Sequence, residues 1–97
     1  MMNKEEVLKN VIEIQKFAME IYEEESDDYV DYRVVKNKER AIFRRLSKIT
    51  PDEELQLKIL NVIETSMWDS KDLTYRTTMK RLREELNIGV EWTRLNY

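Results

Sequence analysis

The stretch from Thr50 to Trp68 constrains the fold of this chain most, because its apolar residues recur at steps of three and four. Thr50, Pro51 and Glu53 carry helix-start signals: a capping hydroxyl, a proline suited to the first helical position and a carboxylate that can complete a capping box. The apolar positions are Leu55, Leu57, Ile59, Leu60, Val62, Ile63 and Met67. A face this wide needs neighbours on several sides. We therefore expect this stretch to form a central helix around which the other segments pack.

Two further segments show the same periodicity. Residues 3–25 open with a capping asparagine, Asn3, and carry apolar residues at alternating steps of four and three. Residues 71–86 repeat the pattern and are followed by Asn87 and Gly89, both typical of helix ends. The chain contains one Gly and one Pro in 97 residues, which disfavours tight hairpins. We expect an all-α fold, a compact bundle of about four helices.

The segment 29–49 supports two interpretations. Its first part, residues 29–35, is rich in Tyr and Val, which favour a strand. Across the whole segment, apolar side chains keep a heptad spacing that favours a helix, and we favour this second interpretation. If residues 29–35 do form a strand, the best partner is the segment 90–97, which also has strand character.

The chain contains neither cysteine nor histidine. Without cysteine there is no disulfide and no thiolate metal site. Without histidine the chain lacks the commonest metal ligand and the usual general base near neutral pH. The dense acidic run at residues 23–31 lacks the alternating ligands and the glycine of a calcium loop. We therefore predict a non-enzyme that uses no metal and no cofactor.

Charge alternates along the chain in blocks, although the net charge is only −3. Residues 1–32 hold three Lys against ten Asp and Glu, giving −7, and residues 33–48 hold seven Lys and Arg against one Glu, giving +6. Residues 49–69 sum to −4 and residues 70–97 to +2. Acidic and basic helices lying side by side would neutralise one another. Alternatively, the blocks form a bipolar surface that docks a charged partner.

The acidic end of the first block carries interleaved tyrosines. Such a surface can imitate the phosphates and bases of a nucleic acid and occupy a protein that normally binds DNA or RNA. The candidate partner-binding residues are Tyr22, Glu24, Asp28, Tyr29, Tyr32 and, in the apolar tail, Trp92. The competing interpretation, which we favour for the tyrosines, places them half-buried at the edge of the core.

The basic block at residues 33–48 offers seven cationic side chains, enough to neutralise several phosphates. The chain as a whole is acidic, with a pI near 5.1, whereas stand-alone DNA-binding domains are usually basic. Nucleic-acid binding by this block is therefore the weaker interpretation.

Residues 74–88 resemble the recognition helix of LuxR-type and sigma-type helix-turn-helix proteins, with a Thr-rich start followed by Arg and Lys and a leucine near the end. Residues 49–63 are similar to the opening helix of that family. The resemblance implies that residues 74–86 form a DNA-binding helix. Its major-groove residues would be Thr74, Arg76, Thr77, Lys80 and Arg81. The chain departs from the family between residues 63 and 74, which are too few for a comfortable middle helix and lack the glycine of the turn.

These features favour a small non-catalytic regulator or inhibitor that acts by binding a protein partner. The alternative is a helix-turn-helix regulator that binds DNA through residues 74–86. The short chain, rich in Lys, Glu, Asn and Ile, suits a bacterial, phage or mobile-element origin. No apolar run approaches a membrane span and the start lacks the order of a signal peptide, so we expect a cytoplasmic protein of one domain, residues 1–97. The apolar stripes of the first two helices also allow a homodimer.

Overall fold

The computed structural model of this protein describes residues 3–69 and 75–88. Within these residues it contains four α-helices and no strand. The helices are α1 (Lys4–Glu25), α2 (Tyr32–Ile49), α3 (Glu53–Asp69) and α4 (Tyr75–Leu86). The expected all-α bundle of about four helices is confirmed.

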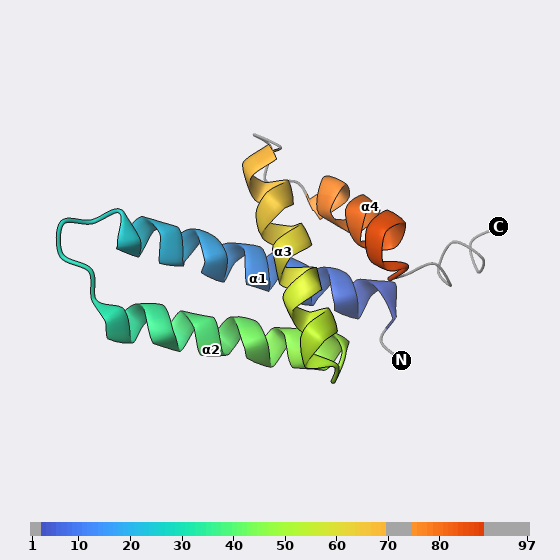
Figure 1. Cartoon of the computed structure of the whole chain (residues 1–97), viewed down its shortest axis with the longest axis horizontal. Helices are drawn as coiled ribbons and strands as arrows, with labels where there is room; N and C mark the ends of the chain where they lie inside the picture. The colour runs from blue at the N-terminus through green and yellow to red at the C-terminus, as the bar shows by residue number, and fades with distance from the viewer. Residues whose placement is uncertain (1–2, 70–74, 89–97) are drawn as a thin grey trace.

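The helices form two layers that cross (Figure 1). α1 and α2 lie side by side and run in opposite directions, joined by the loop at residues 26–31. α3 crosses this hairpin and contacts both of its helices, while α4 lies beside α3 and also contacts α1. α3 therefore has the central position that its wide apolar face predicts. The loop end of the hairpin extends beyond the crossing and forms an arm that neither α3 nor α4 covers.

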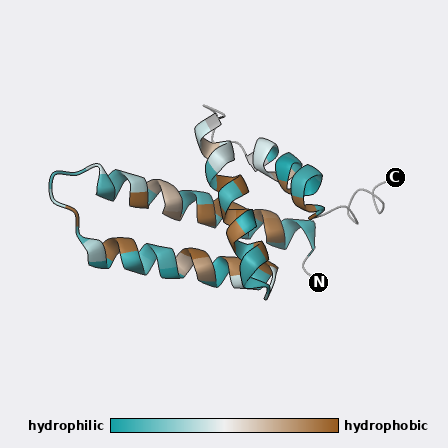
Figure 2. Ribbon diagram, viewed as in Figure 1, coloured by the Kyte–Doolittle hydropathy of each residue, from teal (hydrophilic) through white to brown (hydrophobic). Residues whose placement is uncertain are grey.

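The core lies where α3 crosses the hairpin, and Figure 2 shows apolar residues concentrated at this crossing. Its most deeply buried side chains come from all four helices: Val11, Ile14, Leu46, Ile59, Ile63 and Leu82. Burial of each such side chain stabilises the fold by about 1.5 to 3 kcal/mol relative to full exposure. The expectation that Leu57 widens the buried face of α3 is wrong, because Leu57 is 57% exposed, whereas Val62 is buried as expected.

Asp31 decides the ambiguous segment at residues 29–35 in favour of helix. Its carboxylate accepts the backbone N–H of Arg33 at 3.0 Å and caps α2, and Val35 is buried one turn later. The strand alternative for residues 29–35 is wrong, because the cap and the burial of the helical face outweigh the strand preference of Tyr and Val. The suggested strand partner, residues 90–97, lies outside the described residues.

The start of α3 differs from the expected capping pattern. Thr50 is extended (φ −152°, ψ 143°), because the residue before a proline is pushed away from helical angles. Its hydroxyl accepts the N–H of Asp52 at 3.3 Å. Asp52 in turn caps the helix by accepting the N–H groups of Glu54 and Leu55 at 3.0 and 3.3 Å. The expected cap at Thr50 is therefore wrong by two residues, and Pro51 precedes the helix.

Two other helix ends agree with the sequence. Asn3 caps α1 by accepting a backbone N–H of the first turn at 2.9 Å. Asn87 has a positive φ of 59°, which ends α4, and the N–H groups of Asn87 and Ile88 bond carbonyls of the last turns at 3.1 and 3.2 Å. The expected start of α4 at residues 71–74 and the stop at Gly89 lie outside the described residues.

Candidate functional site

A groove lies in the corner between α3 and the arm of the α1–α2 hairpin. It encloses about 310 Å³. α1, α2 and α3 all contribute to it, because α3 crosses the hairpin and leaves the arm uncovered. The lining residues are Ala18, Ile21, Tyr22 and Glu25 of α1, Glu39, Ile42 and Phe43 of α2, and Leu60, Glu64, Met67 and Trp68 of α3. The groove is therefore a product of the tertiary arrangement rather than of a single helix face.

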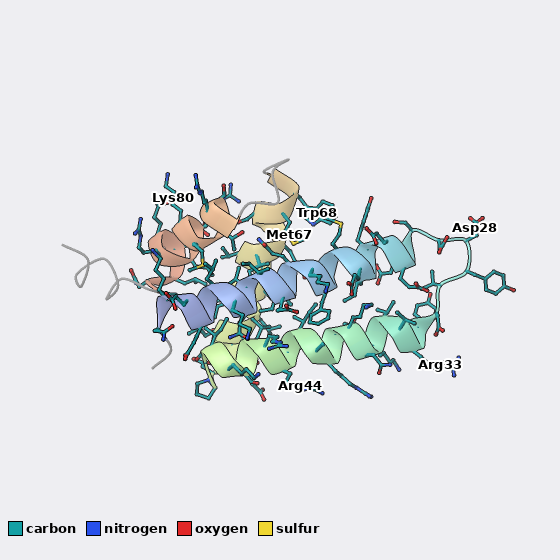
Figure 3. All side chains as sticks on the ribbon, turned by 180° about the vertical axis from the view of Figure 1, so that it is seen from behind. Asp28, Arg33, Arg44, Met67, Trp68 and Lys80 are labelled. Atoms are coloured by element: carbon teal, nitrogen blue, oxygen red, sulfur yellow. The ribbon has the colours of Figure 1, made fainter. Side chains whose placement is uncertain are left out.

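Three large apolar side chains of this groove remain open to solvent. Tyr22 is 50%, Phe43 39% and Trp68 56% exposed, whereas Ile42 and Met67 of the same lining are buried. The rings of Tyr22 and Trp68 meet edge to face, with centroids 4.9 Å apart and planes inclined at 65°. This contact joins α1 to the end of α3, where Figure 3 shows Met67 and Trp68. The groove thus has a buried apolar base and half-exposed aromatic walls.

Three glutamates, one from each helix, belong to the same lining: Glu25, Glu39 and Glu64. The lining contains no lysine and no arginine, so its charge is negative. Partial burial raises the pKa of Glu64 above the usual value of a glutamate. Within the described residues, no group of three or more acidic side chains is arranged to hold a metal ion.

Of the tyrosines predicted to bind a partner, one lines the groove and two do not. Tyr22 lines the groove, but Asp28 and Tyr29 lie in the loop at the tip of the arm, where Figure 3 shows Asp28. Tyr29 is 93% exposed, and Tyr32, at the start of α2, is 70% exposed. The half-buried position favoured for these tyrosines is therefore wrong for Tyr29 and Tyr32, because the uncovered arm gives them no core to border.

Glu24 has a structural role at the same loop. Its carboxylate accepts the backbone N–H of Asp31 at 3.0 Å, which ties the end of α1 to the start of α2. One oxygen of Glu24 is thus engaged within the chain. Trp92, the remaining predicted partner residue, lies outside the described residues.

Among the described residues, two ion pairs join the acidic and basic blocks: Arg33 with Asp31 at the start of α2, at 3.6 Å, and Lys38 with Glu20 between α2 and α1. The Lys38 ammonium also lies 5.9 Å from the centroid of the Phe17 ring. Five other cations of α2 make no ion pair with another described residue: Lys36, Arg40, Arg44, Arg45 and Lys48. Among the described residues, neutralisation between these two helices is therefore confined to one point, and most of the basic block faces solvent.

The residues implied by the helix-turn-helix resemblance lie on α4. Arg76 and Lys80 are exposed, Thr77 and Arg81 are partly buried, and Thr74 lies outside the described residues. The first turns of α4 thus present basic side chains to solvent, as a DNA-contacting helix requires.

The basic side chains of α2 and α4 do not combine into one surface. Figure 3 shows Arg33 and Arg44 along one edge of the molecule and Lys80 along the opposite edge. α3 is continuous from Glu53 to Asp69, and among the described residues no middle helix separates it from α4. The departure from the helix-turn-helix family that the sequence indicated is thus present in the structure.

One apolar line of each of the first two helices, part of the stripes that suggested a homodimer, is used within the chain. Val7, Val11 and Ile14 of α1 and Ile42 and Leu46 of α2 are all buried in the core. The second apolar line of α1 remains accessible, with Ile12 42% and Tyr22 50% exposed, so the homodimer stays a prediction.

Sequence reasoning missed most of the groove. Met67 was expected in the core, and it is buried, but the same residue also lines the groove beside Trp68. The sequence pattern did not mark three other lining residues as part of a site, because each is an ordinary residue of an amphipathic helix: Glu39, Phe43 and Glu64. The sequence feature that could have indicated a groove was the width of the apolar face at residues 50–68. A face this wide needs more neighbouring helices than a small chain can supply.

Within the described residues, no helix combines the length and the apolar character needed to cross a membrane. Comparison with protein families, with curated proteins and with solved structures finds no significant match to this chain.

Proposed function

We propose that this protein is a small non-catalytic regulator or inhibitor that acts by binding a protein partner in the groove between α3 and the arm. The observation that carries this proposal is the convergence of three exposed aromatic side chains, Tyr22, Phe43 and Trp68, on one groove. A contiguous apolar surface rimmed by polar residues is typical of protein interaction sites. A partner would cover the side chains that the described helices leave in water.

The aromatic pair in the groove suits such a role. Tyr and Trp are enriched among the residues that dominate binding energy at interfaces. Tyr22 and Trp68 already contact each other, which reduces the side-chain freedom that binding would remove. We therefore expect these two residues to contribute most to the affinity.

A pull-down tests this function. The tagged protein is used to capture partners from bacterial lysate with and without nuclease, and the captured proteins are identified by mass spectrometry. We expect a stoichiometric protein that survives nuclease treatment and is lost with Trp68→Ala. The matched control is Tyr29→Ala, because Tyr29 is an exposed aromatic residue at the tip of the arm, outside the groove.

Two results would contradict the proposal. One is capture that disappears with nuclease; the other is a partner that Trp68→Ala retains and Tyr29→Ala loses. Circular dichroism of both variants must show unchanged helix content, so that lost binding is not lost folding.

DNA binding through residues 74–86 is a second candidate function, favoured by the exposure of Arg76 and Lys80 on α4. Contacts to phosphates make affinity fall steeply as salt rises. On this hypothesis Arg76→Ala and Lys80→Ala each weaken binding to duplex DNA and reduce the salt dependence. Binding that does not change with salt would rule it out.

A further inference from the structure

We infer that the groove receives a cationic amphipathic helix of the partner protein, with apolar side chains on one face and Lys or Arg beside them. This inference rests on the proposed function and specifies the segment that binds.

The exposed aromatic rings define the apolar half of the match. Tyr22, Phe43 and Trp68 are 39% to 56% exposed, and the buried Ile42 and Met67 complete an apolar surface with them. Leu, Ile or Met side chains on a partner would remove this surface from water, which is favourable in proportion to the apolar area buried. A uniformly polar segment would leave the same surface without such contacts.

The glutamates define the charge of the occupant. Glu25, Glu39 and Glu64 lie on three different helices around the groove, and no lining residue is basic. An acidic segment would bring like charges together and lose affinity, whereas Lys or Arg beside the apolar face would pair with the carboxylates. The occupant is therefore positively charged.

The same glutamates argue against a second copy of this chain seated groove to groove. A two-fold interface places the same patch of both subunits together. Glu25, Glu39 and Glu64 of one copy would then face those of the other, without a basic lining residue to compensate. A positively charged partner is therefore a better match for this groove than the groove of a second copy.

The arrangement of α3 and α4 indicates that the occupant is helical. α4 lies in the corner on one side of α3, where it contacts both α3 and α1, and the groove is the corner on the other side (Figure 1). The lining of α1 from Ala18 to Glu25 spans about 10 Å, and that of α3 from Leu60 to Trp68 about 12 Å, at 1.5 Å per residue. About two turns of a partner helix match these lengths.

A peptide selection against the full-length protein tests the inference. The probe is a displayed library of randomised peptides of about 16 residues, long enough to form a helix on binding. We expect the enriched peptides to carry apolar residues at steps of three and four together with an excess of Lys and Arg. Affinities of the selected peptides for the unaltered protein are then measured by isothermal titration calorimetry.

Two exposed glutamates of α1 provide a matched pair of charge reversals. Glu25 lines the groove, and Glu23, two residues earlier, does not. We expect Glu25→Lys to weaken the selected peptides by about three- to tenfold and Glu23→Lys to leave their affinity unchanged within about twofold. Glu39→Lys and Glu64→Lys should behave like Glu25→Lys.

Several outcomes would overturn the inference. Enriched peptides without a basic excess, or equal losses with Glu23→Lys and Glu25→Lys, would show that charge in the groove does not select the occupant. A dimer in light scattering that Trp68→Ala dissociates would make a second copy the occupant. In each case the pull-down still decides separately whether a protein partner binds, so failure of the inference is distinguishable from failure of the proposed function.

Discussion

On one side of α3, α4 closes the corner against α1, and its Thr78 and Leu82 are each only 1% exposed. On the other side the corner holds the groove, where Tyr22 and Trp68 are 50% and 56% exposed. The same helix borders both corners. The difference therefore arises from the neighbours of α3: α4 fills one corner, and no described helix fills the other.

Polar groups are treated differently in the two corners. In the closed corner the side-chain amide of Gln15 on α1 donates to the hydroxyl of Thr78 on α4 at 2.9 Å, and both residues are buried. In the open corner Glu25, Glu39 and Glu64 are exposed. A helix packed there by the chain itself would have to satisfy these carboxylates, because an unpaired buried charge is strongly destabilising. The closed corner stabilises the fold, and the open one is suited to binding.

The largest change in stability is expected from Leu82→Ala in the closed corner. Removal of this buried side chain should lower the free energy of unfolding by about 2 to 5 kcal/mol, because it leaves a cavity between α4 and the core. Urea unfolding followed by circular dichroism measures the change. A loss below 1 kcal/mol would mean that α4 contributes little to the core.

A smaller effect is expected from Thr78→Val, which keeps the shape of the side chain and removes its hydroxyl. The buried amide of Gln15 then loses its partner, so stability should fall by about 1 to 3 kcal/mol. Thr77→Val is the control on the same helix, since Thr77 is only partly buried, and it should change stability by about 0.5 kcal/mol or less. Equal effects of the two variants in urea unfolding would refute the role given to this hydrogen bond.

In the open corner Trp68→Ala should lower the stability of the fold only slightly and the affinity for a partner strongly. The ring is 56% exposed, so its removal should cost the fold only about 1 kcal/mol, including the contact with Tyr22. Loss of this aromatic side chain should lower the affinity for the captured partner by about tenfold or more. Urea denaturation of this variant measures the loss of stability, and titration with the captured partner measures the loss of affinity. A large stability loss without a binding defect would place Trp68 with the core instead.

The smallest effect is expected from Glu64→Gln and depends on pH. Because partial burial raises the pKa of Glu64, the ionised form is less favourable in the folded state than in the unfolded state. The variant should therefore be slightly more stable than the original near pH 7, by well under about 1 kcal/mol, because the partly buried side chain is still accessible to solvent. The gain should vanish as the pH falls below the ordinary value of 4.5, where both states are protonated. Glu23→Gln is the control, and a gain that persists in acid would exclude this cause.

Most of the helices could be predicted from the sequence, because capping residues and apolar periodicity act locally. Asn3 and Asn87 mark helix ends as expected, and Asp31 resolves the ambiguous segment in favour of helix. Thr50 misled the prediction because Asp52, two residues later, accepts the N–H groups of the first turn in its place. Errors of this kind come from a neighbour in the sequence and shift a boundary by a turn or less.

The groove could not be predicted in the same way. Periodicity shows that Met67 lies on an apolar face, but not whether another helix covers the end of that face. Phe43 and Trp68 come from different helices and meet at one groove only because α3 crosses the hairpin where it does. Crossing positions depend on packing between distant segments, which a single sequence does not reveal.

The short loop that joins α1 to α2 also bears on the order of folding. The loop spans residues 26–31, and the bond from the N–H of Asp31 to Glu24 holds its two ends together. Closing so short a loop costs little entropy, and contacts between neighbouring segments form fastest. The hairpin should therefore form before α3 docks on it, so that the arm is already in place when α3 completes the groove.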